Sequence, residues 1–302
     1  MKIFIALIVA AIVGTGAYFL IQKLSKGSAH MDQSSENNTV TPDTASTTAG
    51  MASAKSATST IGTSVEKRSI TAYHYGSGET ELLLVGGIHG GYSWNTALLA
   101  YELMDHLNAH PDVIPKNVRV TIIPLLNPDG LAKVTTATDH FTSADVTRSE
   151  SARMAGRFNA HKVDLNRNFD CAWQSKGTWQ NKPVSGGEKA FSEPESAAIK
   201  TYIDMHRPAA VIVWYSAAGG VFASKCNGGV LSDTHTITNL FASASGYKAY
   251  EDFDFYEVTG DMANWLAGQK IPAISVLLTS HEDLELDKNK AGVEALIKHY
   301  AK

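Results

Sequence analysis

The chain has 302 residues, of which 44% are hydrophobic, and its 26 Lys and Arg against 30 Asp and Glu give a net charge of −4. This length suffices for one large domain with attached segments. A weak negative charge without a run of Lys or Arg gives no support for a nucleic-acid partner.

The first predicted element is an apolar segment near the N-terminus. Residues 3–21 contain no charge over 19 positions, with Lys2 before them and Lys23 and Lys26 after them. A helix of this length approaches the roughly 30 Å thickness of a bilayer's hydrocarbon core. We predict an uncleaved signal-anchor over residues 1–26, with the membrane as a partner and the domain outside the cytoplasm. The alternatives are a cleaved signal peptide, which would give a secreted protein, and a buried core helix. The balanced flanking charges leave the orientation open.

Residues 27–68 differ in composition from the C-terminal remainder of the chain. They are rich in Ser, Thr and Ala and have almost no large apolar side chain. Such a segment buries too little surface to offset the entropy lost on ordering. We predict a disordered linker here and a folded domain over residues 69–302.

Strands and helices alternate within this domain. Continuous apolar strands interleaved with helices predict an α/β fold, with a mixed, mostly buried sheet and helices on both faces. The expected strands are 69–75, 81–87, 117–126, 209–216 and 271–279, and the expected helices are 94–110, 191–207, 259–269 and 289–301. Sites in such folds lie at the carboxyl ends of strands, which points to His89, Tyr215 and the segment after Leu278.

The chain has two cysteines, Cys171 and Cys226. An exported chain with an even number of cysteines permits a disulfide, and both residues lie beside segments expected near the site. Two buried free thiols are the other interpretation.

Five short stretches together resemble the zinc carboxypeptidase family, the carboxypeptidase A-like metallopeptidases. They are GGIHGG (86–91), VDLNRNFD (163–170), FSEPE (191–195), YEVTGDMANW (256–265) and IPAISV (271–276). Their order and spacing match the family over about residues 69–302. The resemblance implies a zinc cofactor with three protein ligands and a bound water. It also implies a Glu that accepts the water's proton and an Arg that stabilises the oxyanion.

The substrate-binding part of the family pattern is present. The resemblance assigns Asn166 and Arg167 to the substrate's C-terminal carboxylate, which a planar guanidinium binds through two hydrogen bonds. It makes Tyr256 the tyrosine that closes over the peptide. Arg157 stands at the place of the catalytic oxyanion arginine, with Arg153 as a nearby competitor.

The metal-binding part of the pattern is not intact. His89 matches the first zinc ligand, but the expected carboxylate ligand is replaced by Tyr92 or, one residue on, by Ser93. Tyr215 occupies the position of the second histidine ligand. His206 precedes the strand, so it belongs at the opposite edge of the sheet. Two of the three expected ligands are therefore missing, and zinc binding is doubtful.

The general base is missing as well. Leu277 stands where the family has its glutamate, and Leu278 is the alternative register; a leucine cannot accept a proton. His281, Glu282 and Asp283 come directly after this strand and are expected to face the pocket. A rebuilt metal site would combine His89, Asp283 and a tyrosine oxygen.

Three functions are compatible with this pattern. The first is an anchored, exported domain that has lost catalysis and binds peptides with a free C-terminal carboxylate, cell-wall peptides among them. The second is an active zinc carboxypeptidase with a non-standard ligand set, and the third is a purely structural surface domain. Asn264 is a smaller departure, since the family is expected to have an acidic residue there.

Overall fold

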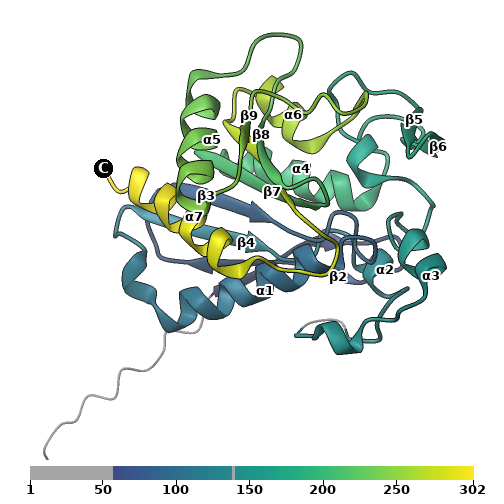
Figure 1. Ribbon diagram of the computed structural model, residues 1–302, viewed down its shortest axis with the longest axis horizontal. Helices are drawn as coiled ribbons and strands as arrows, with labels where there is room; N and C mark the ends of the chain where they lie inside the picture. Colours follow the sequence, from purple (N-terminus) through teal and green to yellow (C-terminus); the bar gives the residue numbers. More distant parts are fainter. Residues whose placement is uncertain (1–56, 138–139) are drawn as a thin grey trace, which may run out of the picture. The chain divides into compact units, whose positions relative to one another are not determined.

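An eight-stranded mixed sheet forms the centre of the computed structural model, which describes residues 57–137 and 140–302 (Figure 1). The strands follow one another across the sheet in the order β1-β2-β4-β3-β7-β10-β8-β9. Their bounds are Ala57–Thr63 (β1), Ser69–Tyr75 (β2), Thr80–Val85 (β3), Val118–Ile123 (β4), Ala210–Ser216 (β7), Gly220–Ala223 (β8), Ala249–Tyr250 (β9) and Ala273–Leu278 (β10). A separate antiparallel pair is formed by β5 (Lys176–Trp179) and β6 (Lys182–Ser185).

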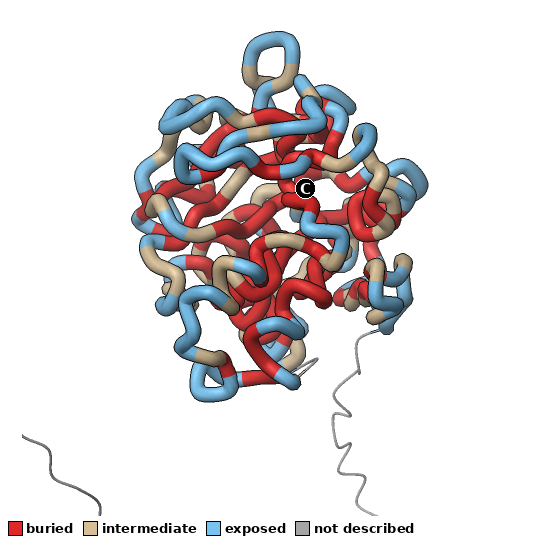
Figure 2. Tube along the Cα trace, turned by 90° about the vertical axis from the view of Figure 1, so that its right-hand side faces the viewer, coloured by how far each residue is buried: buried red, intermediate tan, exposed pale blue. Residues whose placement is uncertain are grey.

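Helices cover both faces of the sheet, as the alternating pattern predicts. The helices are α1 (Trp94–Ala109), α2 (Pro128–Leu131), α3 (Glu150–Ala155), α4 (Pro194–His206), α5 (Ser232–Ser245), α6 (Met262–Gly268) and α7 (Leu286–His299). Apolar residues of α1, α5 and α7 form one core cluster with the sheet, and those of α4 and α6 form the other. Buried segments therefore run through the middle of the domain, between exposed turns (Figure 2).

The central strands β3, β7 and β10 run parallel to one another. The sequences LLLV, AVIVWY and AISVLL are almost continuously apolar, as expected for strands buried on both faces. Parallel strands end at the same edge of a sheet, so their carboxyl ends place three distant segments of the chain side by side. This edge positions the candidate site.

The elements that were not expected from the sequence include β8 and α5. The strand β8 has only four residues, and α5 is rich in Ser and Thr, which have weak helix propensity. Ile237 and Phe241 of α5 are nevertheless fully buried in the core. Tertiary packing, rather than local propensity, stabilises this helix.

The predicted C-terminal boundary of the linker, residue 68, is wrong because residues 57–68 are part of the folded domain. The segment 57–63 is β1, which pairs with β2, and the turn after β1 is bound to buried carboxylates. Ser64 Oγ donates to Asp129 at 2.6 Å, and the Val65 amide donates to Glu195 at 3.1 Å. Backbone pairing and polar contacts hold this segment in place. The linker was predicted from its lack of large apolar side chains, and that property does not reveal such contacts.

The predicted signal-anchor over residues 1–26, and the linker up to residue 56, lie outside the described residues. Among the residues that are described, no helix is both long and apolar enough to cross a membrane.

The domain boundary can be tested with two fragments, 57–302 and 69–302. The shorter fragment lacks β1 and leaves the buried Asp129 and Glu195 without their partners from the turn. Each buried carboxylate oxygen that loses its partner costs about 1–3 kcal/mol. We expect urea denaturation to show fragment 69–302 less stable by at least about 3 kcal/mol, with 57–302 matching the full chain. Equal midpoints would contradict this boundary.

Candidate functional site

A pocket of about 510 Å³ opens at the carboxyl ends of β7 and β10. It is lined by charged, amide and aromatic side chains that come from widely separated segments. They include His89, Tyr92, Arg157, Asn166, Arg167, Trp179, Tyr215, Phe222, Tyr256, Asp261, Leu277 and His281. The substrate residues proposed from the sequence and the altered metal positions thus meet in one cavity.

Strand register places two of the altered positions next to each other. Leu277 of β10 is the parallel partner of Tyr215 of β7, and both line the pocket. Leu278 belongs to the core cluster on the opposite face of the sheet. Of the two alternative registers, the structure therefore places Leu277 at the base position. It offers no proton acceptor there.

The loop after β3 positions His89 beside the sheet. Its glycines allow close packing: a Cβ at Gly91 would lie 2.5 Å from the Gly130 carbonyl oxygen, in the short helix α2. His89 is only 3% exposed as a result.

Both ring nitrogens of His89 are occupied by neighbouring side chains. Nε2 lies 3.1 Å from Asp164 Oδ1, and Nδ1 lies 3.3 Å from Arg157 Nη1. Burial, reinforced by the Arg157 charge, lowers the pKa of His89 to about 4, so the ring is neutral at pH 7. A neutral imidazole has one N–H and one lone pair. Nε2–H therefore donates to Asp164, and the Nδ1 lone pair accepts from the guanidinium.

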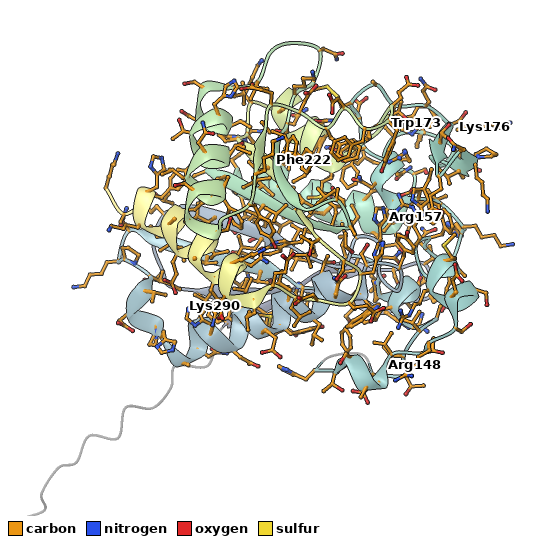
Figure 3. All side chains as sticks on the ribbon, in the orientation of Figure 1. Arg148, Arg157, Trp173, Lys176, Phe222 and Lys290 are labelled. Carbon is orange, nitrogen blue, oxygen red and sulfur yellow. A yellow bond between two sulfur atoms is a disulfide. The ribbon has the colours of Figure 1, made fainter. Side chains whose placement is uncertain are left out.

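Arg157 is held firmly in this position. Its Nε and Nη2 donate to Asp164 Oδ2 at 2.9 and 2.7 Å, and its guanidinium lies 4.3 Å from the centre of the Trp179 ring. Burial alone would raise the pKa of Asp164, but Arg157 and His89 hold it well below its ordinary value. Asp164 is thus a carboxylate that balances the Arg157 charge. Figure 3 shows Arg157 on the side of the molecule that carries β5 and β6.

These residues do not fit the zinc ion that the resemblance implies. The one lone pair of His89 is taken by a guanidinium, and burial raises the pKa of both Tyr92 and Tyr215, so neither phenol is an anionic ligand. Ser93 precedes α1, is buried and does not line the pocket. In the described part of the chain, no three His, Cys, Asp or Glu side chains form a group that could hold a metal ion.

The loop after β10 does not rebuild the metal site. Asp283 is exposed, and its carboxylate accepts from the Glu285 amide at 2.9 Å, away from the pocket lining. Glu282 pairs with Arg153, which removes this competitor of Arg157 from the site. Of the three candidate ligands in this loop, only His281 lines the pocket, with its ring 4.4 Å from that of Tyr92.

His281 Nδ1 lies 3.0 Å from the Ser216 hydroxyl oxygen, at the end of β7. Asn95 Nδ2 donates to the carbonyl oxygens of Ser280 and Asp283, which fixes the amide orientation. Asn95 Oδ1 must then accept from the Ser216 hydroxyl, at 3.0 Å. The Ser216 hydroxyl thus donates to Asn95, and His281 Nδ1 lies beside the same oxygen.

The short helix Leu165–Arg167 presents the two residues assigned to carboxylate binding. Asp164 caps it by accepting from the Asn166 amide at 3.1 Å. Arg167 is 1% exposed, and its Nη1 and Nη2 donate to the carbonyl oxygens of Asn166 and Thr178. Its Nε has no hydrogen-bond partner. Within the described residues, this buried cation meets only neutral acceptors.

Tyr215 has a structural task in place of metal binding. Its hydroxyl donates to Asn166 Oδ1 at 3.0 Å, and the Met262 amide donates to the same oxygen at 3.1 Å. Asn166 Nδ2 then donates to Asp261 Oδ2 at 2.8 Å. The Asn166 amide is thereby fixed between β7 and the start of α6.

Tyr256 lies at the rim of the pocket. It is 46% exposed and packs edge-on against Phe253, with ring centroids 4.9 Å apart. This position agrees with a side chain that could cover a bound ligand.

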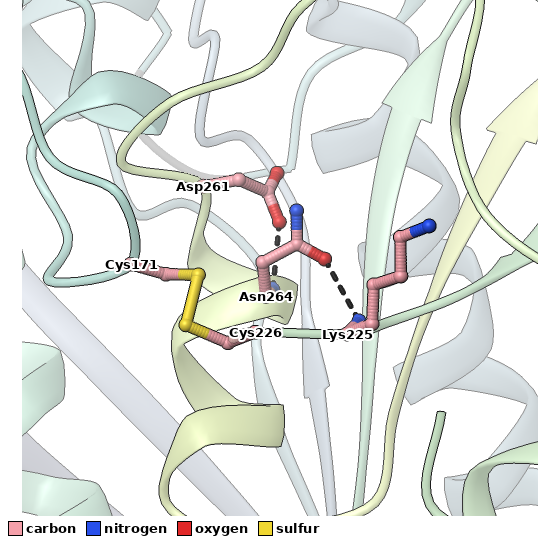
Figure 4. The surroundings of a disulfide bond; sticks show 5 residues. All are labelled: Cys171, Lys225, Cys226, Asp261 and Asn264. Carbon is pink, nitrogen blue, oxygen red and sulfur yellow. Dashed lines mark hydrogen bonds between the residues drawn. A yellow bond between two sulfur atoms is a disulfide. The ribbon is translucent and has the colours of Figure 1, made fainter. Parts of the chain in front are cut away.

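A disulfide lies beside the start of α6. Cys171 and Cys226 are bonded, with their Cα atoms 5.9 Å apart. Figure 4 shows Asn264 between Asp261 and Lys225: its backbone amide donates to Asp261, and its side-chain oxygen accepts from the Lys225 amide at 3.1 Å. Asn264, where an acidic residue was expected, thus joins α6 to the segment that follows β8.

Gly260 brings the Asp261 segment against the Arg167 backbone. It has a φ of +63°, and a Cβ there would lie 2.2 Å from the Arg167 carbonyl oxygen. Its backbone accepts from the Phe169 amide and donates to the Cys171 carbonyl. This contact holds the Asp261 segment close to the Arg167 backbone.

Sequence reasoning missed three site residues: Asp164, Trp179 and Asp261. Asp164 and Asp261 lie inside stretches already singled out, VDLNRNFD and YEVTGDMANW, so buried acids two residues before Asn166 and five after Tyr256 were available signals. Trp179 lies in the β5–β6 hairpin, and no pattern in the sequence indicates a role for that hairpin.

Comparison with known proteins agrees with this fold. A model of the zinc carboxypeptidase family matches residues 44–282. The chain therefore belongs to the zinc carboxypeptidase family. A metallocarboxypeptidase A of Trichophyton tonsurans is 29% identical over 199 residues, which are 62% of this chain and 42% of the relative. The chain thus spans less than half the length of this relative.

Solved structures show the same fold. Carboxypeptidase A of Helicoverpa armigera has a TM-score of 0.59 at 20% identity, covering 82% of this chain and 67% of that one. Murein-tripeptide amidase from Escherichia coli O157 has a TM-score of 0.55, also at 20% identity, covering 80% and 91%.

Zinc uptake tests the metal assignment. We expect the purified chain to hold far less than one zinc ion at pH 7, and Tyr92→Glu with Tyr215→His to bind about one, because these changes supply two good ligands beside His89. Ser93→Glu with Tyr215→His is the matched control, since Ser93 does not line the pocket. Elemental analysis after dialysis gives the stoichiometry. One tightly held zinc per unaltered chain would contradict the assignment.

The pH dependence of stability tests the His89 contacts. The folded pKa of about 4 lies below the ordinary histidine value of 6.5, so the unfolded chain binds a proton first as the pH falls. The contribution of neutral His89 to the free energy of unfolding is therefore fully present above about pH 6.5. It is lost as the pH falls towards 4, by about 3 kcal/mol in all. His89→Gln, whose amide can also donate to Asp164 and accept from Arg157, should lose this pH dependence. An NMR titration placing His89 near 6.5 would refute the assignment.

Proposed function

We propose that this domain binds the free C-terminal carboxylate of peptides and does not hydrolyse them. The observation that carries the proposal is Arg167, a buried cation that lines the pocket and whose hydrogen bonds, among the described residues, go only to carbonyl oxygens. Removing an ion from water without a directly paired counter-charge costs several kcal/mol. A bound carboxylate would offset that penalty.

The shape and position of Arg167 suit this ligand. A guanidinium has five N–H groups, and only two of them donate to the Asn166 and Thr178 carbonyls. A planar carboxylate can accept from the others in a paired geometry. Asn166 has a second Nδ2–H besides the one given to Asp261, and Tyr256 stands at the rim to cover the ligand.

The same pocket lacks the parts needed for hydrolysis. Leu277 cannot take a proton from water, and the lone pair of His89 is occupied by Arg157. The competing proposal of an active zinc carboxypeptidase needs a bound metal, which the zinc measurement decides. A purely structural domain would bind no peptide, and the buried Arg167 guanidinium would then have no carboxylate partner from a ligand.

We propose further that the domain is held at a membrane outside the cytoplasm. The uncharged run over residues 3–21 supports an anchor, and the Cys171–Cys226 disulfide suits an oxidising compartment. Cell-wall peptides are the ligands to test first there, since the family acts on peptides and a structural neighbour is named a murein-tripeptide amidase.

The binding proposal is tested by titrating a short peptide acid and its C-terminal amide into the full chain. The acid should bind at least about tenfold more tightly, because only it supplies a charge for Arg167. Arg167→Met should abolish this difference. Arg148→Met is the matched control, since Arg148 lies well apart from Arg157 in Figure 3 and does not line the pocket. Equal affinity for acid and amide would remove the proposal, and cleavage of the acid would favour an active enzyme.

A further inference from the structure

The Cys171–Cys226 disulfide joins three segments beside the carboxylate site (Figure 4). Cys171 comes shortly after Arg167 in the chain, and Cys226 follows β8. The Cys171 carbonyl oxygen accepts from the Gly260 amide at 2.8 Å, just before α6 begins. Cys226 packs at the other end of α6, where a Cβ on Gly268 would lie 3.5 Å from its Sγ. The disulfide therefore cross-links the Arg167 segment, the end of β8 and the surroundings of α6.

The burial of Arg167 disfavours this closed arrangement. Its guanidinium donates to the carbonyl oxygens of Asn166 and Thr178, its Nε has no hydrogen-bond partner, and the residue is 1% exposed. An outward movement of the segment that carries Arg167 would return the cation to water and remove the penalty of burying it. A cross-link in the same segment restricts such local opening. The order of the carboxylate site is therefore expected to depend on the disulfide.

The disulfide can be reached from solvent on the Cys226 side. Cys226 is half-buried, and the three residues that follow it, Asn227, Gly228 and Gly229, are exposed. A Cβ on Gly229 would meet no other atom within 4 Å. Cys171, by contrast, is only 8% exposed. A reductant from solution is therefore expected to attack Cys226 Sγ rather than Cys171 Sγ.

Thiol–disulfide exchange with a dithiol reductant gives a balanced reaction. A thiolate of the reductant attacks Cys226 Sγ, the protein S–S bond breaks, and Cys171 leaves as a thiolate that takes up a proton. The second thiol of the reductant then breaks the mixed disulfide and releases Cys226 as a thiol, so the reductant becomes a cyclic disulfide. A more oxidising disulfide runs the same steps in reverse and restores the Cys171–Cys226 bond.

We propose that the Cys171–Cys226 disulfide is a redox switch of the carboxylate site: the oxidised chain binds peptide C-termini, and the dithiol chain binds them weakly. This switch rests on the proposed carboxylate binding and adds to it control by the redox state. In the dithiol form, the Arg167 segment opens and hydrates its cation. The site is then competent only where disulfides persist, which is in oxidising compartments.

The first experiment compares binding by the full chain before and after treatment with dithiothreitol. In calorimetric titrations, N-acetyl-Ala-Leu should bind about tenfold more weakly to the reduced chain, because only its closed fraction is competent to bind. The double variant Cys171→Ser with Cys226→Ser is the control. It should show the affinity of the reduced chain both with and without dithiothreitol.

The outcomes of this titration are distinct. Equal affinity of the oxidised and reduced chains would overturn the switch. Loss of the far-UV circular dichroism spectrum on reduction would also overturn it, because the whole domain would then unfold rather than one segment. If the oxidised chain binds N-acetyl-Ala-Leu and its C-terminal amide equally well, the carboxylate binding itself is refuted.

Thermodynamic linkage gives a second test. If oxidation raises the affinity for the peptide acid, the bound acid must favour the disulfide by the same factor. In a glutathione buffer that leaves about half of the chains oxidised, saturating N-acetyl-Ala-Leu should raise the oxidised-to-reduced ratio about tenfold, and its amide should not. Mass spectrometry after trapping of free thiols measures this ratio. Arg167→Met should lose the effect, whereas Arg148→Met, outside the pocket lining, should keep it. Equal ratios with acid and amide would refute the switch.

Discussion

The hydrogen-bonded series Asp164–His89–Arg157 determines the chemistry of this pocket. A neutral histidine lies between a carboxylate and a guanidinium, and each of its nitrogens has a partner. Asp164 also binds Arg157 directly, so the three side chains form a closed, charge-balanced unit in a buried place. The cation beside His89 is therefore the Arg157 guanidinium. Unlike a metal ion, a guanidinium does not coordinate and activate a water molecule.

The substitutions around this unit are consistent with one another. The Arg157 guanidinium occupies the His89 lone pair that would bind zinc. Without zinc there is no metal-bound water, so a general base at position 277 would have no such water to deprotonate. Tyr215 instead fixes the Asn166 amide, and Leu277 beside it supplies apolar surface. Tyr215 and Leu277 therefore hold Asn166 in place and add apolar surface to the pocket.

The arrangement also separates two kinds of charge. Arg157 and Asp164 pair directly with each other, whereas the hydrogen bonds of Arg167 and Asp261 go to neutral groups. Buried charges are stabilised by partners or by ligands. The first pair accordingly belongs to the architecture of the site, and the second pair faces the cavity where a ligand would lie. The hydrogen bonds of Gly260 and the nearby disulfide hold the second pair in place.

The sequence alone determined the α/β class, the central apolar strands and the family, because hydrophobic periodicity and short motifs are local properties of the chain. It also predicted Asn166, Arg167, Tyr256 and Tyr215 as site positions, and all four line the pocket. Only the tertiary structure decided that Leu277 rather than Leu278 faces the pocket, that the domain begins with β1, and that Arg157 occupies the lone pair of His89. It alone placed Asp261 near Arg167. These outcomes depend on strand register and on contacts between residues dozens to more than a hundred positions apart, which no local pattern specifies.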